Sequence, residues 1–238
     1  MKKFVGILLI PLVIAAVAVF ILSMSAGKII QAGVERLGSE IAQVDIELDG
    51  AHISFLSGSG GLEGLKIHNP EGYEGDHAFY AQHLALDIQP MSVFSDKIVI
   101  DEILIIGPDI QFEQRLKSSN LNKILQNVQA YMGPAGEAQE TASGGKKLEI
   151  KRFVLQDANV GVGIGSKPVS ITIPTIELTN LGSDQEGITA GEAMSLVFKE
   201  VTNQIIAEIA KNPEIIFKGG GDLLKNVGGS GGNALKSL

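Results

Sequence analysis

The stretch HLALDIQPMSVFSDKIVIDEILIIGPDIQF, residues 83–112, decides the fold. Apolar side chains recur at every second position along it, and this period of two predicts β-strands with one apolar face. The pattern continues on both sides of the stretch. It therefore predicts a mainly β domain with helices, an α+β fold built on a curved antiparallel sheet or groove. The positions that carry the pattern are Ile46, Leu48, Leu65, Ile67, Leu84, Leu86, Ile88, Ile98, Ile100, Ile103, Ile105, Ile110, Phe112, Leu148, Ile150, Val160, Val162, Ile164, Val169, Ile171, Ile173, Ile176 and Leu178.

Glycine and proline residues separate these strand patterns, and they are the residues most typical of turns and breaks. Pro174 lies inside a strand pattern, which favours a sheet edge or a bulge at that point. The predicted turns and breaks are Gly58-Ser59-Gly60-Gly61, Asn69-Pro70, Glu71-Gly72, Gly107-Pro108 and Ser166-Lys167-Pro168.

Three stretches have helical rather than strand spacing: residues 26–44, 120–132 and 191–211. Each has an apolar stripe and a polar remainder, so each predicts an amphipathic helix. We expect the first to cap the β domain, because its polar face is not notably basic and would bind anionic lipid weakly. Asn120 or Ser119 is suited to cap the second helix, and Asn212-Pro213 ends the third.

An uncharged apolar run extends from Phe4 to Met24 and is 21 residues long. As a helix rising about 1.5 Å per residue it matches a hydrocarbon core of about 30 Å, so residues 1–25 are predicted to be a transmembrane anchor. Lys2 and Lys3 precede the run, which places the N-terminus in the cytoplasm and the rest of the chain outside. A cleaved signal peptide is the alternative, but the run exceeds the usual apolar region of about 7–15 residues. The residues expected to contact lipid in the anchor are Phe4, Leu9, Val13 and Phe20.

The remainder of the chain is expected to form one β-rich domain, residues 26–218, followed by a flexible Gly-rich tail, residues 219–238. Residues 133–147 are polar and Gly-rich and predict a mobile loop within the domain. The net charge of -8 argues against nucleic-acid binding, which requires a basic patch. The absence of cysteine excludes disulfides and thiolate chemistry.

The sequence offers no motif for catalysis, for a metal or for a cofactor. The four histidines, His52, His68, His77 and His83, match no common spacing of metal ligands. Adjacent carboxylates such as those at positions 101 and 102 are expected on opposite strand faces, where they cannot share one substrate. We therefore expect a protein that is not an enzyme, with no cofactor and no metal.

The apolar strand faces remain as the candidate site. A long apolar face with few helices to cover it must be buried against another sheet, a partner, or a ligand with hydrocarbon chains. The residues we predict to face lipid are Leu84, Leu86, Ile88, Ile98, Ile100, Ile103, Ile105, Val160, Val162, Ile171 and Ile173.

Several segments of residues 1–180, taken in order, carry a family resemblance. After the anchor and the short helix come GSGGLEGLKIHNPEGY (58–73), ALDIQPMSVF (85–94), IVIDEILIIGPDI (98–110), Glu113, Asn120-Leu121 and KLEIKR (147–152). In this order of features the chain resembles the AsmA-like family of envelope proteins, whose wider group has a repeating β-groove that carries lipid. The resemblance implies an inner-membrane protein that faces the periplasm, maintains the envelope and binds or moves phospholipid; it implies no catalytic residues.

Two functions therefore stay open. The first is a domain that binds phospholipid, or helps to transfer it, through an apolar sheet face. The second is an interaction or assembly module that recruits another envelope protein, or a second copy, through sheet edges or the tail. With about eight to ten strands side by side, the sheet would extend about 40 to 50 Å, too short to bridge a periplasm alone.

Overall fold

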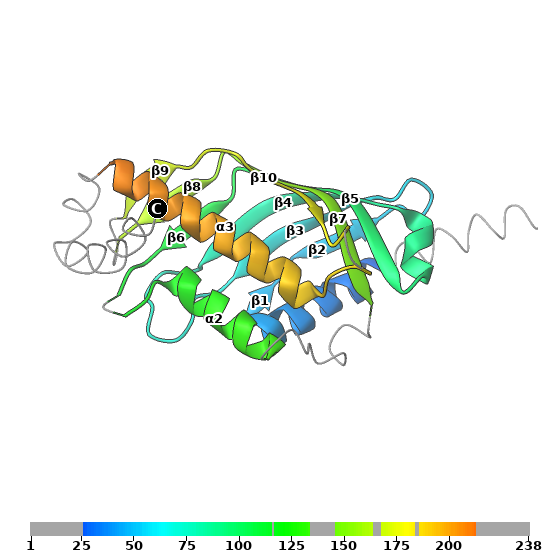
Figure 1. The fold of residues 1–238 in the computed structure, drawn as a ribbon, viewed down its shortest axis with the longest axis horizontal. Coiled ribbons are helices and arrows are strands. Elements are labelled where there is room, and N and C mark those ends of the chain that lie inside the picture. Colours follow the sequence, from blue (N-terminus) through cyan, green and yellow to red (C-terminus); the bar gives the residue numbers. More distant parts are fainter. Residues whose placement is uncertain (1–25, 116, 134–145, 164–167, 184–185, 213–238) are drawn as a thin grey trace, which may run out of the picture.

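The computed structural model describes residues 26–115, 117–133, 146–163, 168–183 and 186–212 (Figure 1). Within these residues a curled sheet of ten strands is combined with three α-helices and one short 3-10 helix, so the fold is mixed α+β. The strands are β1 (Ile46–Glu47), β2 (Gly50–Ile53), β3 (Ser59–Ile67), β4 (Phe79–Ile88), β5 (Lys97–Ile106), β6 (Asp109–Phe112), β7 (Lys147–Gln156), β8 (Asn159–Val162), β9 (Val169–Thr172) and β10 (Ile176–Leu181). The helices are the stretch 26–42, η1 (Pro90–Phe94), α2 (Asn120–Met132) and α3 (Ala190–Lys211).

The ten strands lie in six rows, because four rows each contain two strands end to end. β1 and β2 pair with β3 in one constant register, and β5 and β6 pair with the same edge of β4 in another. β7 with β8, and β10 with β9, follow the same arrangement. Six rows span five spacings of about 4.8 Å, or about 24 Å. The expected extent of 40 to 50 Å is therefore wrong, because the strands are not all side by side.

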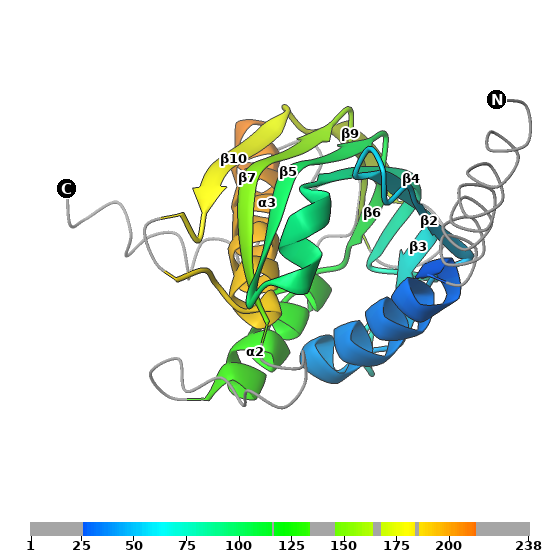
Figure 2. The same ribbon diagram turned by 90° about the vertical axis from the view of Figure 1, so that its right-hand side faces the viewer.

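The sheet bends where the double rows are interrupted. Gly107, with φ +62°, lies between β5 and β6, and Asp157, with φ +54°, lies at the same level between β7 and β8. Two hydrogen bonds cross this level, from Gly107 N to the carbonyl of Gln156 and from Asn159 N to the carbonyl of Pro108, each 2.9 Å. Because the bends are in register, the sheet curls as a whole into a half-barrel (Figure 2). Here the predicted break at Gly107-Pro108 is confirmed.

One of the five row contacts is parallel, and it comprises two strand pairs: β5 with β7, and β6 with β8. The expectation of a wholly antiparallel sheet is wrong at these rows. The chain between β6 and β7 contains α2, and such a crossover returns the chain to the start of a parallel strand. All other strand pairs among the described residues are antiparallel.

The 26–42 helix covers the edge of the sheet at β1. Three side chains one turn apart satisfy backbone groups that an edge strand leaves unpaired. Ser39 Oγ accepts a hydrogen bond from Ile46 N (2.9 Å), and Glu35 Oε1 accepts one from Leu48 N (3.1 Å). Gln31 Nε2 donates to the carbonyl of Leu48. The expected capping role of this helix is therefore confirmed, and its polar stripe protects the edge from strand addition.

The other two helices lie along the open side of the arch that the sheet forms (Figure 2). Ser119 caps α2, since Asn122 N donates to its Oγ (3.1 Å). Thr189 and Glu192 form a capping box that begins α3, which ends before Asn212 as predicted. Buried side chains from both helices join those of the inner sheet face in one core: Leu121, Ile124, Val128, Ala193, Phe198, Val201, Ile205 and Ile209.

The predicted break at Gly58-Ser59-Gly60-Gly61 is confirmed only at Gly58, which has φ +81° in the turn before β3; Ser59, Gly60 and Gly61 already belong to β3. A Cβ on Gly60 would lie 2.7 Å from the carbonyl oxygen of His52 in β2, so glycine here allows two strands to approach closely. The turn after β3 is as predicted: the strand ends before Asn69-Pro70, and Gly72 has φ +90°.

The predicted anchor and tail lie outside the described residues. This applies to residues 1–25, with Phe4, Leu9, Val13 and Phe20, to 213–238, and to 134–145 of the predicted loop. Among the described residues, no helix has the length and apolar composition that crossing a membrane requires.

Candidate functional site

The inner face of the sheet is apolar, and its two ends differ in burial. Toward β6, β8 and β9 the inner side chains are core residues, such as Ile110 and Val160, which are both fully buried. Toward η1 six inner side chains stay partly exposed, although Ile150 of β7 beside them is buried. We call these partly exposed residues the inner strip: Leu86, Ile88, Ile98, Ile100, Ile103 and Leu148.

Strand register places the inner strip on three neighbouring rows. Leu86 of β4 is opposite Ile103 of β5, Ile88 is opposite Ile100, and Ile98 is opposite Leu148 of β7. At about 3.3 Å per residue, the five steps from Ile98 to Ile103 cover about 16 Å. Two spacings of about 4.8 Å make the strip about 10 Å wide. The strip is thus long, narrow and aliphatic.

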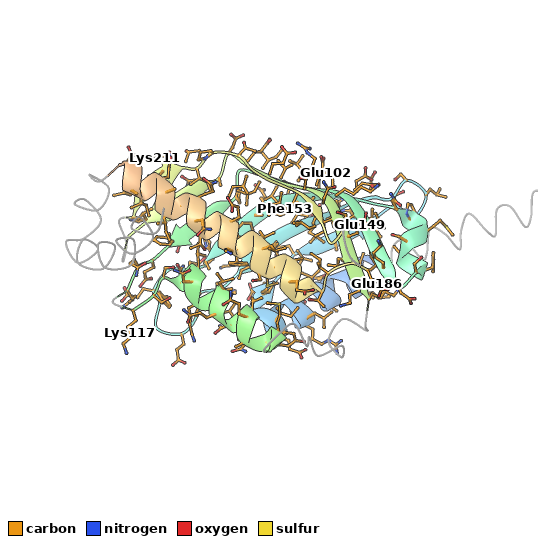
Figure 3. The ribbon with its side chains drawn as sticks, viewed as in Figure 1. Glu102, Lys117, Glu149, Phe153, Glu186 and Lys211 are labelled. Atoms are coloured by element: carbon orange, nitrogen blue, oxygen red, sulfur yellow. The ribbon has the colours of Figure 1, made fainter. Side chains whose placement is uncertain are left out.

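The position of α3 explains why this part of the sheet is less covered. In Figure 1, η1 and the strand ends beside it extend beyond the first turn of α3. Figure 3 labels Phe153 beside α3 in this view, and Phe153 is only 4% exposed and belongs to the same core as the buried side chains of α3. Further toward η1, Ile98, Ile100 and Leu148 retain partial contact with solvent, whereas Ile150 of β7 is 3% exposed.

The eleven residues predicted to face lipid divide into two groups. Five are core residues, each less than 9% exposed, and so are held by the protein itself: Leu84, Ile105, Val160, Val162 and Ile173. Six are partly exposed: Leu86, Ile88, Ile98, Ile100, Ile103 and Ile171. Ile171 lies in β9 at the other end of the sheet, opposite Val160, and is separate from the strip. The sequence prediction missed Leu148, although it has the same period of two.

The outer face of the same strands is charged. Lys151 forms an ion pair with Asp101 (2.7 Å) and keeps the pKa of that carboxyl below its usual range. Arg152 joins Glu102 to Glu177 across three rows and lowers the pKa of Glu177. Charged outer and aliphatic inner side chains therefore mark the two faces clearly.

The predicted separation of Asp101 and Glu102 onto opposite faces is wrong. The register of β4 against β5 shifts at this point, from Asp87 opposite Glu102 to Ile88 opposite Ile100. This bulge leaves both carboxylates on the outer face, each paired with its own cation on β7. It also keeps Ile100 and Ile103 on the same inner face although they are three residues apart.

A buried polar network occupies the opposite end of the domain from η1. Asn120 Nδ2 donates to Asn69 Oδ1 (2.7 Å) and to the carbonyl of Gln111 (2.6 Å), and its Oδ1 accepts from Glu113 N (3.1 Å). Asn69 Nδ2 in turn donates to the carbonyls of Gly75 (2.8 Å) and His77 (3.0 Å). The Asn-Pro-x-Gly segment thus has a structural role, as the predicted hairpin connection requires.

The histidines are spread over the domain. His52 and His83 are exposed on strands, and His68 Nε2 lies 3.2 Å from a carboxylate oxygen of Glu47. His77 is 8% exposed, with Nε2 3.0 Å from an oxygen of Asp109. Within the described ranges, no group of three or more His, Asp or Glu side chains is arranged to hold a metal ion.

The inner strip is therefore the candidate site, and its chemistry is that of a hydrocarbon surface. Its six side chains are all aliphatic, so it can bind an apolar group. No known family model matches the sequence, and no relative is found among curated proteins, so the resemblance to the AsmA-like family stays a prediction.

Proposed function

We propose that this protein is an inner-membrane-anchored periplasmic protein of envelope maintenance that binds phospholipid, or helps to transfer it, through the inner strip. The observation that carries the proposal is the set of six aliphatic side chains that share one sheet face and stay partly exposed. Exposed apolar surface of this kind is unfavourable in water and is stabilised by an apolar ligand.

The dimensions of the strip support an acyl chain as the ligand. Half of a hydrocarbon core of about 30 Å is about 15 Å, which is the depth that one leaflet of acyl chains fills. The strip is about 16 Å long and extends about 4.8 Å to each side of β5, so it is about 10 Å wide. Each methylene group buried there contributes about 0.8 kcal/mol.

The position of the strip also supports this function. Between Ile88 and Ile98 the chain forms η1, so the strip begins at one end of the domain. The 26–42 helix starts at the same end, since a Cβ on Gly27 would overlap the carbonyl oxygen of Ala51 in β2. The predicted anchor would therefore hold the strip next to the bilayer that supplies the lipid.

Native mass spectrometry of the full chain, extracted from a bacterial membrane in mild detergent, tests lipid binding. We expect phospholipid bound to the wild-type protein. Ile103→Gln places an amide against the acyl chain, which costs about 1–3 kcal/mol and should reduce occupancy about tenfold. Leu104→Gln is the matched control, because Leu104 is also partly exposed but faces the outer side. A wild-type protein that is consistently empty, or equal loss in both variants, would contradict the proposal.

Topology has its own test. An enzyme reporter that is active only outside the cytoplasm, fused after Leu238, should be active if residues 4–24 anchor the chain as proposed. As a control, a second reporter that is active only in the cytoplasm is fused at the same position, and we expect it to be inactive. Activity of the cytoplasmic reporter alone would contradict a periplasmic domain.

An assembly module is the second candidate, and one observation favours it. The outer edge of β9 and β10 has no strand partner among the described residues. Added strands pair with such edges in many complexes. Photo-crosslinking from Thr179, which is exposed on β10, should capture a neighbouring protein in cells if this edge recruits one. Captured lipid with no protein would leave the first candidate in place.

A further inference from the structure

One end of the domain carries the most exposed apolar side chains. Among the described residues seven large apolar side chains are strongly exposed, and four of them exceed 70%: Leu56 (86%), Phe94 (78%), Met91 (76%) and Ile29 (73%). The other three, Ile106, Leu196 and Ile206, lie between 39% and 54%. Exposure of this degree is costly unless something apolar covers the side chains.

The four residues come from three segments that meet at this end. Leu56 lies in the turn between β2 and β3, and Met91 and Phe94 lie in η1. The turn and η1 lie close together, because a Cβ on Gly58 would lie 3.1 Å from Cδ of Pro90, the first residue of η1. Ile29 lies in the first turn of the 26–42 helix, beside β2. In Figure 2 these segments lie toward the viewer at one end of the arch.

The turn between β2 and β3 carries no charge, and the connection that contains η1 carries one, Asp96 at its end. Residues 53–61 are ISFLSGSGG and residues 88–95 are IQPMSVFS. The connection between β3 and β4 at the opposite end contains Glu71, Glu74 and Asp76. The two ends of the sheet therefore differ in polarity, as they would if one faced lipid and the other faced water.

The predicted anchor fixes what lies against this end. Only Ser25 separates Met24, the last residue of the apolar run, from Ala26, the first described residue. One residue covers at most about 3.6 Å, so Ala26 must lie at the surface of the bilayer. Ile29 follows within about 5 Å along the helix axis.

We propose that Ile29, Leu56, Met91 and Phe94 form an apolar tip that enters the interfacial region of the bilayer crossed by residues 4–24. The tip orients the domain so that η1, and with it the start of the inner strip, rests on the membrane. Lipid can then pass from bilayer to strip along apolar side chains without crossing water. The inference rests on the anchor of the proposed function, and it adds a second contact with the membrane.

Single-cysteine labelling tests the tip, and the chain is suited to it because it contains no cysteine. The full chain is reconstituted in phosphatidylcholine–phosphatidylglycerol vesicles as the variants Leu56→Cys, Met91→Cys and Phe94→Cys. Each is labelled with a polarity-sensitive fluorophore. Ile106→Cys and Leu196→Cys are the controls, since both positions are exposed and apolar but lie outside the tip. Circular dichroism of each variant checks that the fold is retained.

We expect blue-shifted emission at the three tip positions and loss of most of it when lipids with a spin label in the upper acyl chain are included. The two controls should keep their emission. Tip labels as accessible to water as the controls would overturn the inference, and so would labels that are shielded but not quenched by lipid, which would indicate a protein partner or a second copy. Flotation of the vesicles separates the two proposals. A chain that does not float has lost the anchor itself, whereas a chain that floats with unquenched tip labels retains the anchor and refutes only the tip.

Discussion

Replacement of Asn120 by alanine is the most direct test of how the far end of the domain is held together. Asn120 is fully buried, and its side chain makes three hydrogen bonds. They join the turn after β3, the end of β6 and the start of α2.

The cost of Asn120→Ala follows from the groups that lose their partners. Asn69 Oδ1, the carbonyl of Gln111 and the amide of Glu113 each lose a bond of 2.6 to 3.1 Å. A stranded buried polar group costs about 1–3 kcal/mol, and the lower value applies where water can enter the space that is left. Three such groups give about 3 kcal/mol, a large share of the 5–15 kcal/mol that stabilises a typical domain.

Thermal unfolding of the full chain in mild detergent, followed by circular dichroism, measures this cost. For a domain of this size, 3 kcal/mol corresponds to a fall in Tm of about 6–12 °C. Asn122→Ala is the matched control, because Asn122 lies two residues along the same helix and its side chain makes no hydrogen bond. Alanine is the better helix former, so the control should change stability by less than about 0.5 kcal/mol. Equal Tm values for the two variants would refute a stabilising role for the network.

Three further predictions use the same melts. Gly64→Ala should destabilise by more than about 1 kcal/mol, because Gly64 has φ +64°, whereas Gly33→Ala, in open helical surroundings, should stabilise slightly. The Lys66 ammonium lies 2.8 Å from Asp76 and keeps the pKa of that carboxyl below its unfolded value of about 3.9. The ion pair therefore stabilises the fold fully above about pH 3.9, and this stabilisation is lost as the pH falls through the folded pKa. Lys66→Met should therefore lower Tm at pH 7 and have little effect at pH 2; an equal loss at both would contradict this. Glu35→Ala removes the acceptor of the Leu48 amide at the sheet edge and should lower the free energy of unfolding by about 1 kcal/mol. An unchanged Tm would show that the edge does not need this hydrogen bond from the helix.

The period of two in the sequence predicted most strands, and its changes of phase also contain the bends. From Leu84 of β4 to Phe112 of β6, inner residues occupy even positions up to Ile100, odd positions at Ile103 and Ile105, and even positions again at Ile110 and Phe112. Each change of phase matches a bulge or break in the structure. The prediction for Asp101 and Glu102 was wrong because it assumed uninterrupted alternation through this point.

The candidate site was only partly predictable. Alternation identified which side chains share the inner face, but it treated Ile105 and Ile103 alike. In the structure Ile105 is 4% exposed and Ile103 is partly exposed. Their difference depends on where α3 lies above the sheet, and the position of α3 is not encoded in the pattern of the strand. The exposure of Leu56, Met91 and Phe94 was likewise not visible, because short apolar segments beside turns are equally typical of a core.

The sequence alone determined the local structure: an apolar N-terminal run, strands with one aliphatic face, three amphipathic helices and the turn at Asn69-Pro70. These features depend on near neighbours along the chain, because backbone sterics and side-chain periodicity act over a few residues. Only the tertiary structure decided that ten strands form six rows, that β5 and β7 run parallel, and that α2 and α3 leave one end of the inner face exposed. Those outcomes depend on contacts between residues far apart in sequence, where many pairings satisfy the same local pattern and packing selects one of them.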